Sequence, residues 1–217
     1  MPLTVALIQG GGAGYDLVAA VRLVLDAAGV GITFEEHVAG QEAIARGQPG
    51  LPPALLDAVK KHGRALKTWL RPAVEAPHTN YNVLLRRELG LFASVRPLKN
   101  LKGLPARFQG VDMLVVRELT EDLYASIEHE IVPGVVQSIK VVTESASKRV
   151  FRFAFDYARK AGRKAIHCVH KANILKLADG LFLEAFRAVA RDYPDLLCKE
   201  IIVDNCCMQM VARPQQF

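Results

Sequence analysis

The chain has 217 residues, of which 51% are hydrophobic, and its 28 Lys+Arg against 22 Asp+Glu give a net charge of +6. The hydrophobic fraction is too high, and the charge too small, for a disordered chain. No stretch approaches the roughly 18 uninterrupted apolar residues of a membrane helix, and the first residues lack the basic segment of a secretory signal. We therefore expect no membrane partner, and one or two domains with a sizeable core.

The positive net charge raises the question of nucleic-acid binding. The basic residues are spread along the chain, aromatic residues make up only 7%, and no zinc-finger spacing occurs. Scattered basic residues are typical of a solvated surface, so we expect no nucleic-acid partner. The four cysteines, Cys168, Cys198, Cys206 and Cys207, form no CxxC pair and predict reduced, mostly buried thiols in a cytoplasmic protein.

The first hundred residues alternate strand and helix patterns. Strands are predicted over residues 3–9, 31–38, 64–70 and 91–96. Helices are predicted over residues 17–27, 51–62 and 83–89, with a loop over 71–82. This alternation predicts an α/β sheet layer.

A glycine-rich turn follows the first predicted strand. Gly10 and Gly12 begin a GxGxxG pattern, but Tyr15 stands at its last position. The dinucleotide-binding fingerprint therefore fails, and we expect a tight strand-to-helix turn with positive φ instead.

A connector over residues 102–110 contains glycine and proline, and it is the best candidate for a domain boundary. We therefore predict an α/β domain over 1–101 and a second domain over 102–217. Further strands are predicted over residues 113–118, 164–170 and 199–204, with an exposed, arm-like strand pair over 135–143. Helices are predicted over residues 147–161, 179–192 and 206–213, the first two capped by Ser147 and Asp179.

Three arginines, Arg86, Arg96 and Arg117, lie where predicted helices or strands meet loops. Each guanidinium is a planar fork that matches a carboxylate or a phosphate. Three such forks in one pocket would suit a substrate with several carboxylates. Spacing alone equally allows three surface arginines that never meet.

Three further residues suggest chemistry. Lys171 and Asp204 follow predicted strands, at the ends where α/β sheets bind ligands, and Tyr124 lies seven residues after Arg117. A Lys–Tyr pair is able to shuttle protons, and a carboxylate at a strand end suits Mg²⁺ or Mn²⁺. The alternatives are a packed tyrosine, a surface lysine and a helix N-cap.

The segments RELTEDLYASIEHE, AIHCVHKANILKLADG and IIVDNCCMQMVARPQQF together resemble the isocitrate/isopropylmalate dehydrogenase family, most closely the subunits of NAD-dependent isocitrate dehydrogenase. The resemblance runs from Val5 to Phe217. It implies that family's α/β fold, with an incomplete large domain and a small domain that carries arm-like strands. It also implies oxidation of a 2-hydroxy acid by NAD, or by NADP, and decarboxylation assisted by Mg²⁺ or Mn²⁺.

The resemblance assigns roles to the residues above. It implies that Arg86, Arg96 and Arg117 hold carboxylates of isocitrate or a related 2-hydroxy di- or tricarboxylate. Asn80 stands at the position of a substrate-contacting serine.

Tyr124 and Lys171 correspond to the family's catalytic tyrosine and lysine, and Asp204 to a metal-binding aspartate. The family's counterparts of Lys171 and Asp204 serve the partner subunit's site. A homodimer, or a hetero-oligomer with a family subunit, is therefore implied.

Several departures from the family pattern matter for activity. Asn80 adds bulk in the substrate pocket, and Leu119 replaces an asparagine. The chain also ends before the family's segment with two further metal carboxylates and before its adenosine-binding segment. We therefore expect a truncated chain that is inactive alone, with its cofactor residues unknown. The alternative is a non-catalytic regulatory subunit or relic that binds a partner subunit and a tricarboxylate.

Overall fold

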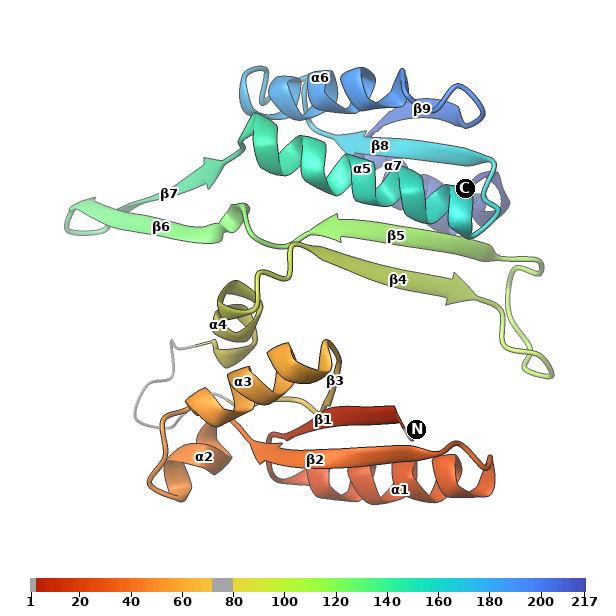
Figure 1. Cartoon of the computed structure of the whole chain (residues 1–217). Coiled ribbons are helices and arrows are strands. Elements are labelled where there is room, and N and C mark those ends of the chain that lie inside the picture. Colours follow the sequence, from red (N-terminus) through yellow and green to blue (C-terminus); the bar gives the residue numbers. More distant parts are fainter. Residues whose placement is uncertain (1–2, 72–79) are drawn as a thin grey trace. The chain divides into compact units, whose positions relative to one another are not determined.

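The computed structural model describes residues 3–71 and 80–217 (Figure 1). Contacts divide the chain into two compact units, Met1–Gly90 and Leu91–Phe217. The connector over residues 102–110 joins two paired strands of the second unit. The division into domains at residue 101 stays a prediction.

The first unit is built on a three-stranded parallel sheet. Its strands are β1 (Leu3–Gln9), β2 (Ile32–Val38) and β3 (Ala65–Lys67), in the order β2-β1-β3. The central strand β1 is buried from Val5 to Gln9 because it has a neighbour on each side. The strand predicted over 64–70 is shorter than expected, since its pairing with β1 stops at Lys67.

Helices connect the parallel strands, as parallel pairing requires. Helix α1 (Ala13–Ala27) lies between β1 and β2, α2 (Gln41–Ala45) and α3 (Pro53–His62) lie between β2 and β3, and α4 (Tyr81–Glu88) follows β3. The core of the unit packs α3 and α4 against the sheet through Ile8, Ala39, Leu55, Leu70, Tyr81 and Leu85. Of the loop predicted over 71–82, residues 72–79 lie outside the described residues.

The expected glycine turn between β1 and α1 is confirmed. Gly11 and Gly12 have φ of 79° and 56°, a region that other residues adopt only with strain. A Cβ on Gly10 would lie 1.9 Å from the carbonyl oxygen of Trp69, so this position also needs glycine.

The second unit contains three strand pairs. The pair β4 (Ala93–Lys99) with β5 (Asp112–Glu118) is antiparallel, as is β6 (Asp122–Val132) with β7 (Val135–Val141). The pair β8 (Ala165–His170) with β9 (Leu197–Ile202) is parallel. The arm was expected over 135–143 alone. Its longer strand β6 lies upstream and was not predicted.

Three helices complete the second unit: α5 (Glu144–Lys160), α6 (Ala178–Ala190) and α7 (Val203–Ala212), followed by the short turn η1 (Pro214–Gln216). Helices α5 and α6 pack on each other (Figure 1) through a core that includes Phe151, Phe155 and Phe186. Figure 1 shows the β6–β7 hairpin projecting beyond this helical layer as an arm.

Two predicted helix caps are wrong. Thr143 caps α5 by accepting a hydrogen bond from the Ala146 amide at 3.2 Å. Ser147 is instead buried inside the helix, where its hydroxyl donates to the Thr143 carbonyl at 2.7 Å. Asp179 lies inside the first turn of α6, whose N-cap is Leu177 and has no side-chain cap. Its carboxylate instead accepts hydrogen bonds from Lys140 and from the Lys171 amide.

The cysteines are free thiols: Cys168 and Cys206 are buried, Cys198 is half-buried and Cys207 is exposed. Burial raises the pKa of the Cys168 thiol to about 12. Within residues 3–71 and 80–217, no helix is long and apolar enough to cross a membrane.

Candidate active-site residues

Two of the three candidate arginines lie on one face of the β4–β5 pair. In the register of this pair Arg117 is opposite Ser94, and Arg96 is two residues further along the same strand as Ser94. Side chains two residues apart in a strand point to the same side, so both guanidinium groups share a face. Arg96 Nε also donates to Ser94 Oγ at 3.3 Å.

These two arginines carry unneutralised charge. Both are exposed, and among the described residues neither guanidinium forms an ion pair with a carboxylate. Five other arginines, among them Arg163 with Asp112, do form ion pairs with carboxylates within the described part of the chain. The two exposed guanidinium groups on this face are therefore available to an anionic ligand.

Tyr124 lies beside this face because the strand β6 is irregular. The Arg117 Cζ atom is 5.5 Å from the centre of the Tyr124 ring. Asp122 and Ser126 flank the tyrosine with φ of 63° and 55°, and the β6–β7 register shifts between Asp122 and Ile127. Such a bulge redirects a side chain, and non-glycine residues with positive φ concentrate at functional sites.

Lys171 and Asp204 form a second group. Lys171 directly follows β8, and Asp204 is in the first turn of α7, directly after β9. Because these strands are parallel neighbours, with His170 opposite Ile202, their carboxyl ends meet at one edge. The Lys171 Nζ atom donates to Asp204 Oδ2, with the two side chains 31% and 67% exposed.

Asp204 is not the cap of its helix. The N-cap of α7 is Ile202, so the capping alternative for Asp204 is wrong. Its carboxylate is instead directed to Lys171.

Sequence reasoning missed the partners of Asp179. This residue is 5% exposed, and its Oδ2 accepts from the Lys171 amide at 2.6 Å. Its Oδ1 accepts from Lys140 Nζ at 2.5 Å, and Lys140 also contacts Asp122 Oδ2 at 2.9 Å. The capping rule for helices is local, so it contained no signal for partners 8 and 39 residues away.

The first unit holds Asn80 and Arg86, both on or beside α4. Asn80 Oδ1 caps the helix by accepting from the amides of Asn82 and Val83 at 3.0 and 3.3 Å. Burial, and then the nearby Arg86 guanidinium, lower the pKa of Lys67. Arg86 and Lys67 are thus two neighbouring cations, an arrangement that favours an anion. The joining of Arg86 with Arg96 and Arg117 in one pocket stays a prediction.

The first unit also contains a cavity of about 490 Å³ at the carboxyl end of β1 and β2. Its polar lining groups are already paired with each other. Gln9 Nε2 donates to Glu36 Oε2 at 2.7 Å, and Arg46 donates to the Tyr15 hydroxyl at 2.9 Å. The cavity offers no free charge that would select a ligand.

The donors required for a metal ion are incomplete among the described residues. Within residues 3–71 and 80–217, no group of three or more His, Cys, Asp or Glu side chains is placed to hold a metal. Mg²⁺ and Mn²⁺ require several oxygen ligands. Asp204 alone, paired with Lys171, does not fit such an ion, so further carboxylates would have to come from elsewhere.

The chain is similar in sequence to proteins of a known family. A family profile described as isocitrate/isopropylmalate dehydrogenase matches residues 4–217. The mitochondrial regulatory subunit 1 of NAD isocitrate dehydrogenase from Arabidopsis thaliana is 47% identical over 100% of this chain and 58% of its own length. The mitochondrial catalytic subunit 5 from the same organism is 41% identical, again over 100% and 58%.

The fold of the chain is also similar to that of a solved structure. The crystal structure of isocitrate dehydrogenase from Methylococcus capsulatus has a TM-score of 0.92 and 43% identity, covering all of this chain and 65% of that one. The chain thus spans less than two thirds of the length of these proteins.

The expected cytoplasmic location is wrong. Similar subunits from Arabidopsis thaliana and Schizosaccharomyces pombe are named as mitochondrial proteins. Reduced thiols occur in more than one compartment, so the cysteines did not distinguish between them.

The predicted fold class is confirmed by the profile and by the solved structure. This chain belongs to the isocitrate/isopropylmalate dehydrogenase family.

Proposed function

We propose that this chain is part of a protein that binds isocitrate, or a related 2-hydroxy polycarboxylate, through Arg96 and Arg117. The observation that carries the proposal is the pair of unneutralised guanidinium groups on one face of β4–β5, with Tyr124 beside them. A polycarboxylate supplies the negative charges that this face lacks. Arg86, from the first unit, is proposed to hold a further carboxylate.

The proposed reaction is NAD-linked oxidative decarboxylation of isocitrate to 2-oxoglutarate, with NADP as the alternative cofactor. When bound, the nicotinamide cofactor supplies the hydride chemistry. Lys171 is proposed to take the proton of the substrate hydroxyl, and Tyr124 to return a proton to the enolate that remains after loss of carbon dioxide. The guanidinium of Arg117, 5.5 Å from the centre of the Tyr124 ring, is proposed to hold that ring beside the substrate.

The pairing of Lys171 with Asp204 bears on this role. Lys171 Nζ is engaged by Asp204, so this contact must open before Lys171 reaches a substrate hydroxyl. If Mg²⁺ or Mn²⁺ were bound, Asp204 would be one ligand and carboxylates from a partner subunit would complete the set. A homodimer or a hetero-oligomer with another family subunit would supply them.

A regulatory subunit is the second candidate. Two observations favour it: the regulatory relative is 47% identical against 41% for the catalytic one, and the Asn80 side chain is engaged in capping α4. Such a subunit would bind the polycarboxylate through the same arginines without turning it over.

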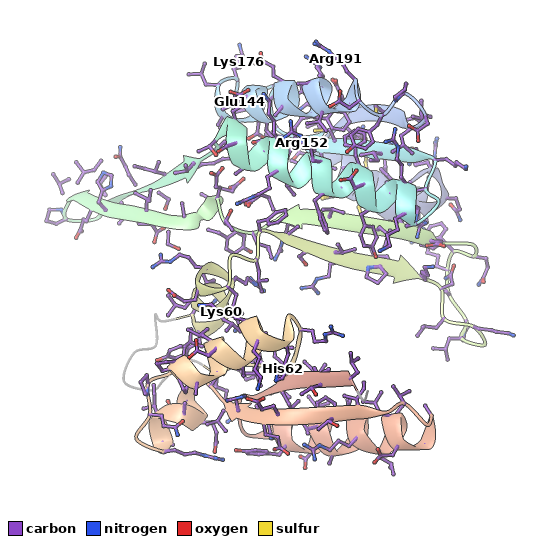
Figure 2. The ribbon with its side chains drawn as sticks, in the orientation of Figure 1. Lys60, His62, Glu144, Arg152, Lys176 and Arg191 are labelled. Carbon is purple, nitrogen blue, oxygen red and sulfur yellow. The ribbon has the colours of Figure 1, made fainter. Side chains whose placement is uncertain are left out.

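The test measures binding and turnover separately. Isothermal titration calorimetry with isocitrate is performed on the protein and on Arg96→Met and Arg117→Met. Loss of one charge-assisted contact of about 1.5–3 kcal/mol weakens binding roughly 10- to 150-fold. The matched control is Arg152→Met, because Arg152 is an exposed arginine on α5, away from the β4–β5 strands (Figure 2).

Turnover decides between the two candidates. NAD reduction with isocitrate and Mg²⁺ is measured with the partner subunit present, against a Lys171→Ala control. Turnover lost in the control supports the enzyme, and binding without turnover supports the regulatory subunit. Equal isocitrate binding by the protein and both arginine variants refutes the proposal.

A further inference from the structure

The buried carboxylate of Asp179 joins three separate elements of the second unit. Asp179 belongs to α6, Lys140 to the arm strand β7, and Lys171 to the loop after β8. The two carboxylate oxygens divide their partners: Oδ1 accepts from Lys140 Nζ at 2.5 Å and Oδ2 accepts from the Lys171 amide at 2.6 Å. A buried charge needs such partners, because leaving it unpaired is costly.

We infer that Asp179 is a positioning residue that couples the base of the β6–β7 arm to the backbone of Lys171. This inference rests on the proposed function for the role of Lys171 in proton transfer. The coupling itself is a property of the second unit and is measurable without substrate.

The direction of the Asp179 side chain separates this role from helix capping. An acidic residue in the first turn of a helix usually stabilises that helix's own amides. In α6 no side chain caps the N-terminus, and the Asp179 carboxylate is directed to Lys140 and Lys171 instead. Asp179 accepts from the backbone amide of Lys171 and not from its ammonium group. This contact fixes the backbone from which the Lys171 side chain extends.

The same network reaches the irregular segment around Tyr124. Lys140 Nζ also contacts Asp122 Oδ2 at 2.9 Å, and Asp122 pairs with Val141 at the base of the arm. Asp122 has φ of 63° and stands two residues before Tyr124. Lys140 therefore links the start of the bulge that carries Tyr124 to the carboxylate that holds Lys171.

The electrostatics of Lys140 agree with a charged link. Burial disfavours its ammonium form, but hydrogen bonds to Asp179 and Asp122 outweigh burial and raise the pKa of Lys140. The Lys140 ammonium thus stays charged over the physiological range, and a displacement of the arm would disturb its two ion pairs.

The primary test is spectroscopic and requires no ligand. The amide of Lys171 donates to a carboxylate at 2.6 Å, so we expect a downfield proton resonance and slow hydrogen exchange for this amide. In Asp179→Asn the resonance should move upfield and the exchange should become faster, because the acceptor loses its charge. Asp195→Asn is the matched control, because it breaks the exposed ion pair with Arg159 in the same unit and leaves the Lys171 amide unchanged.

The arm's contribution is tested at Lys140. Lys140→Met removes the arm end of the link and should shift the Lys171 amide and speed its exchange, whereas Lys140→Arg should restore both. If Asp179→Asn unfolds because Lys140 then keeps only Asp122 as an anionic partner, the double variant Asp179→Leu/Lys140→Met removes both charges and has no acceptor for the Lys171 amide.

The kinetic test uses the protein with its partner subunit. A misplaced Lys171 should lower kcat by about 10- to 100-fold, with the KM for isocitrate changed less than twofold in Asp179→Asn.

An unchanged Lys171 amide in Asp179→Asn or in Lys140→Met overturns the coupling, whatever the protein binds. A shifted amide together with failed isocitrate binding instead overturns the proposed function and leaves the coupling intact. If the Lys171 amide resonance shifts in Asp179→Asn but kcat is unchanged, Asp179 does not position Lys171 for catalysis, and the positioning role is overturned.

Discussion

Replacing Phe155 with alanine should remove a fully buried ring from the packing of α5 against α6. The ring of Phe155 is 0% exposed. Its centre lies 4.7 Å from the stacked ring of Tyr193 and 5.6 Å from that of Phe186. The variant therefore leaves a cavity between two helices and loses two aromatic contacts.

The expected cost follows from this burial. Phe→Ala in a core destabilises by about 3–5 kcal/mol, and this is a large part of the roughly 5–15 kcal/mol that stabilises a typical domain. With a urea dependence of about 2 kcal/mol per molar, the midpoint should fall by roughly 1.5–2.5 M. The neighbour Phe153 is only half-buried and contacts Phe92 at 5.7 Å, so Phe153→Ala should cost about 1–2 kcal/mol.

The assay is urea unfolding followed by far-UV circular dichroism, with both variants and the parent protein at one concentration. The reasoning is refuted if Phe155→Ala costs less than Phe153→Ala, because the packing of α5 on α6 would then not depend on the buried ring.

Four other predictions concern strain, capping, thiol reactivity and titration. Ser126→Gly should raise the free energy of unfolding by up to about 1 kcal/mol, since φ of 55° strains serine. It should also lower turnover, because the bulge then holds Tyr124 less firmly. A loss of stability in urea unfolding contradicts the first expectation. Thr143→Ala should cost about 1–2 kcal/mol by the same measurement, because Thr143 caps α5; a change within a few tenths of a kcal/mol contradicts it. A thiol reagent at neutral pH should modify exposed Cys207 first and buried Cys168 last. Because burial raises the pKa of Cys168 from 9.0 to about 12, the stability tied to its proton is present below pH 9 and lost as pH rises toward 12, and Cys168→Val should reduce that loss.

The sequence alone determined the order of most elements, because local burial patterns repeat along a strand or helix, but it missed α2 and β6. The placement of Lys171 and Asp204 after predicted strands followed from that order. The pairing of β8 with β9 then brought the two side chains into contact.

Strand pairing and burial in the tertiary structure decided the arm, the shared face of the two arginines and the role of Asp179. β6 was missed because an exposed, bulged strand has no alternating apolar face to recognise. The shared face of Arg96 and Arg117 depends on the register of β4 with β5, which links residues about 20 positions apart. The role of Asp179 depends on partners from two other elements. A helix-capping rule considers only the nearest turn, whereas a buried carboxylate is oriented by whichever donors the tertiary fold places around it.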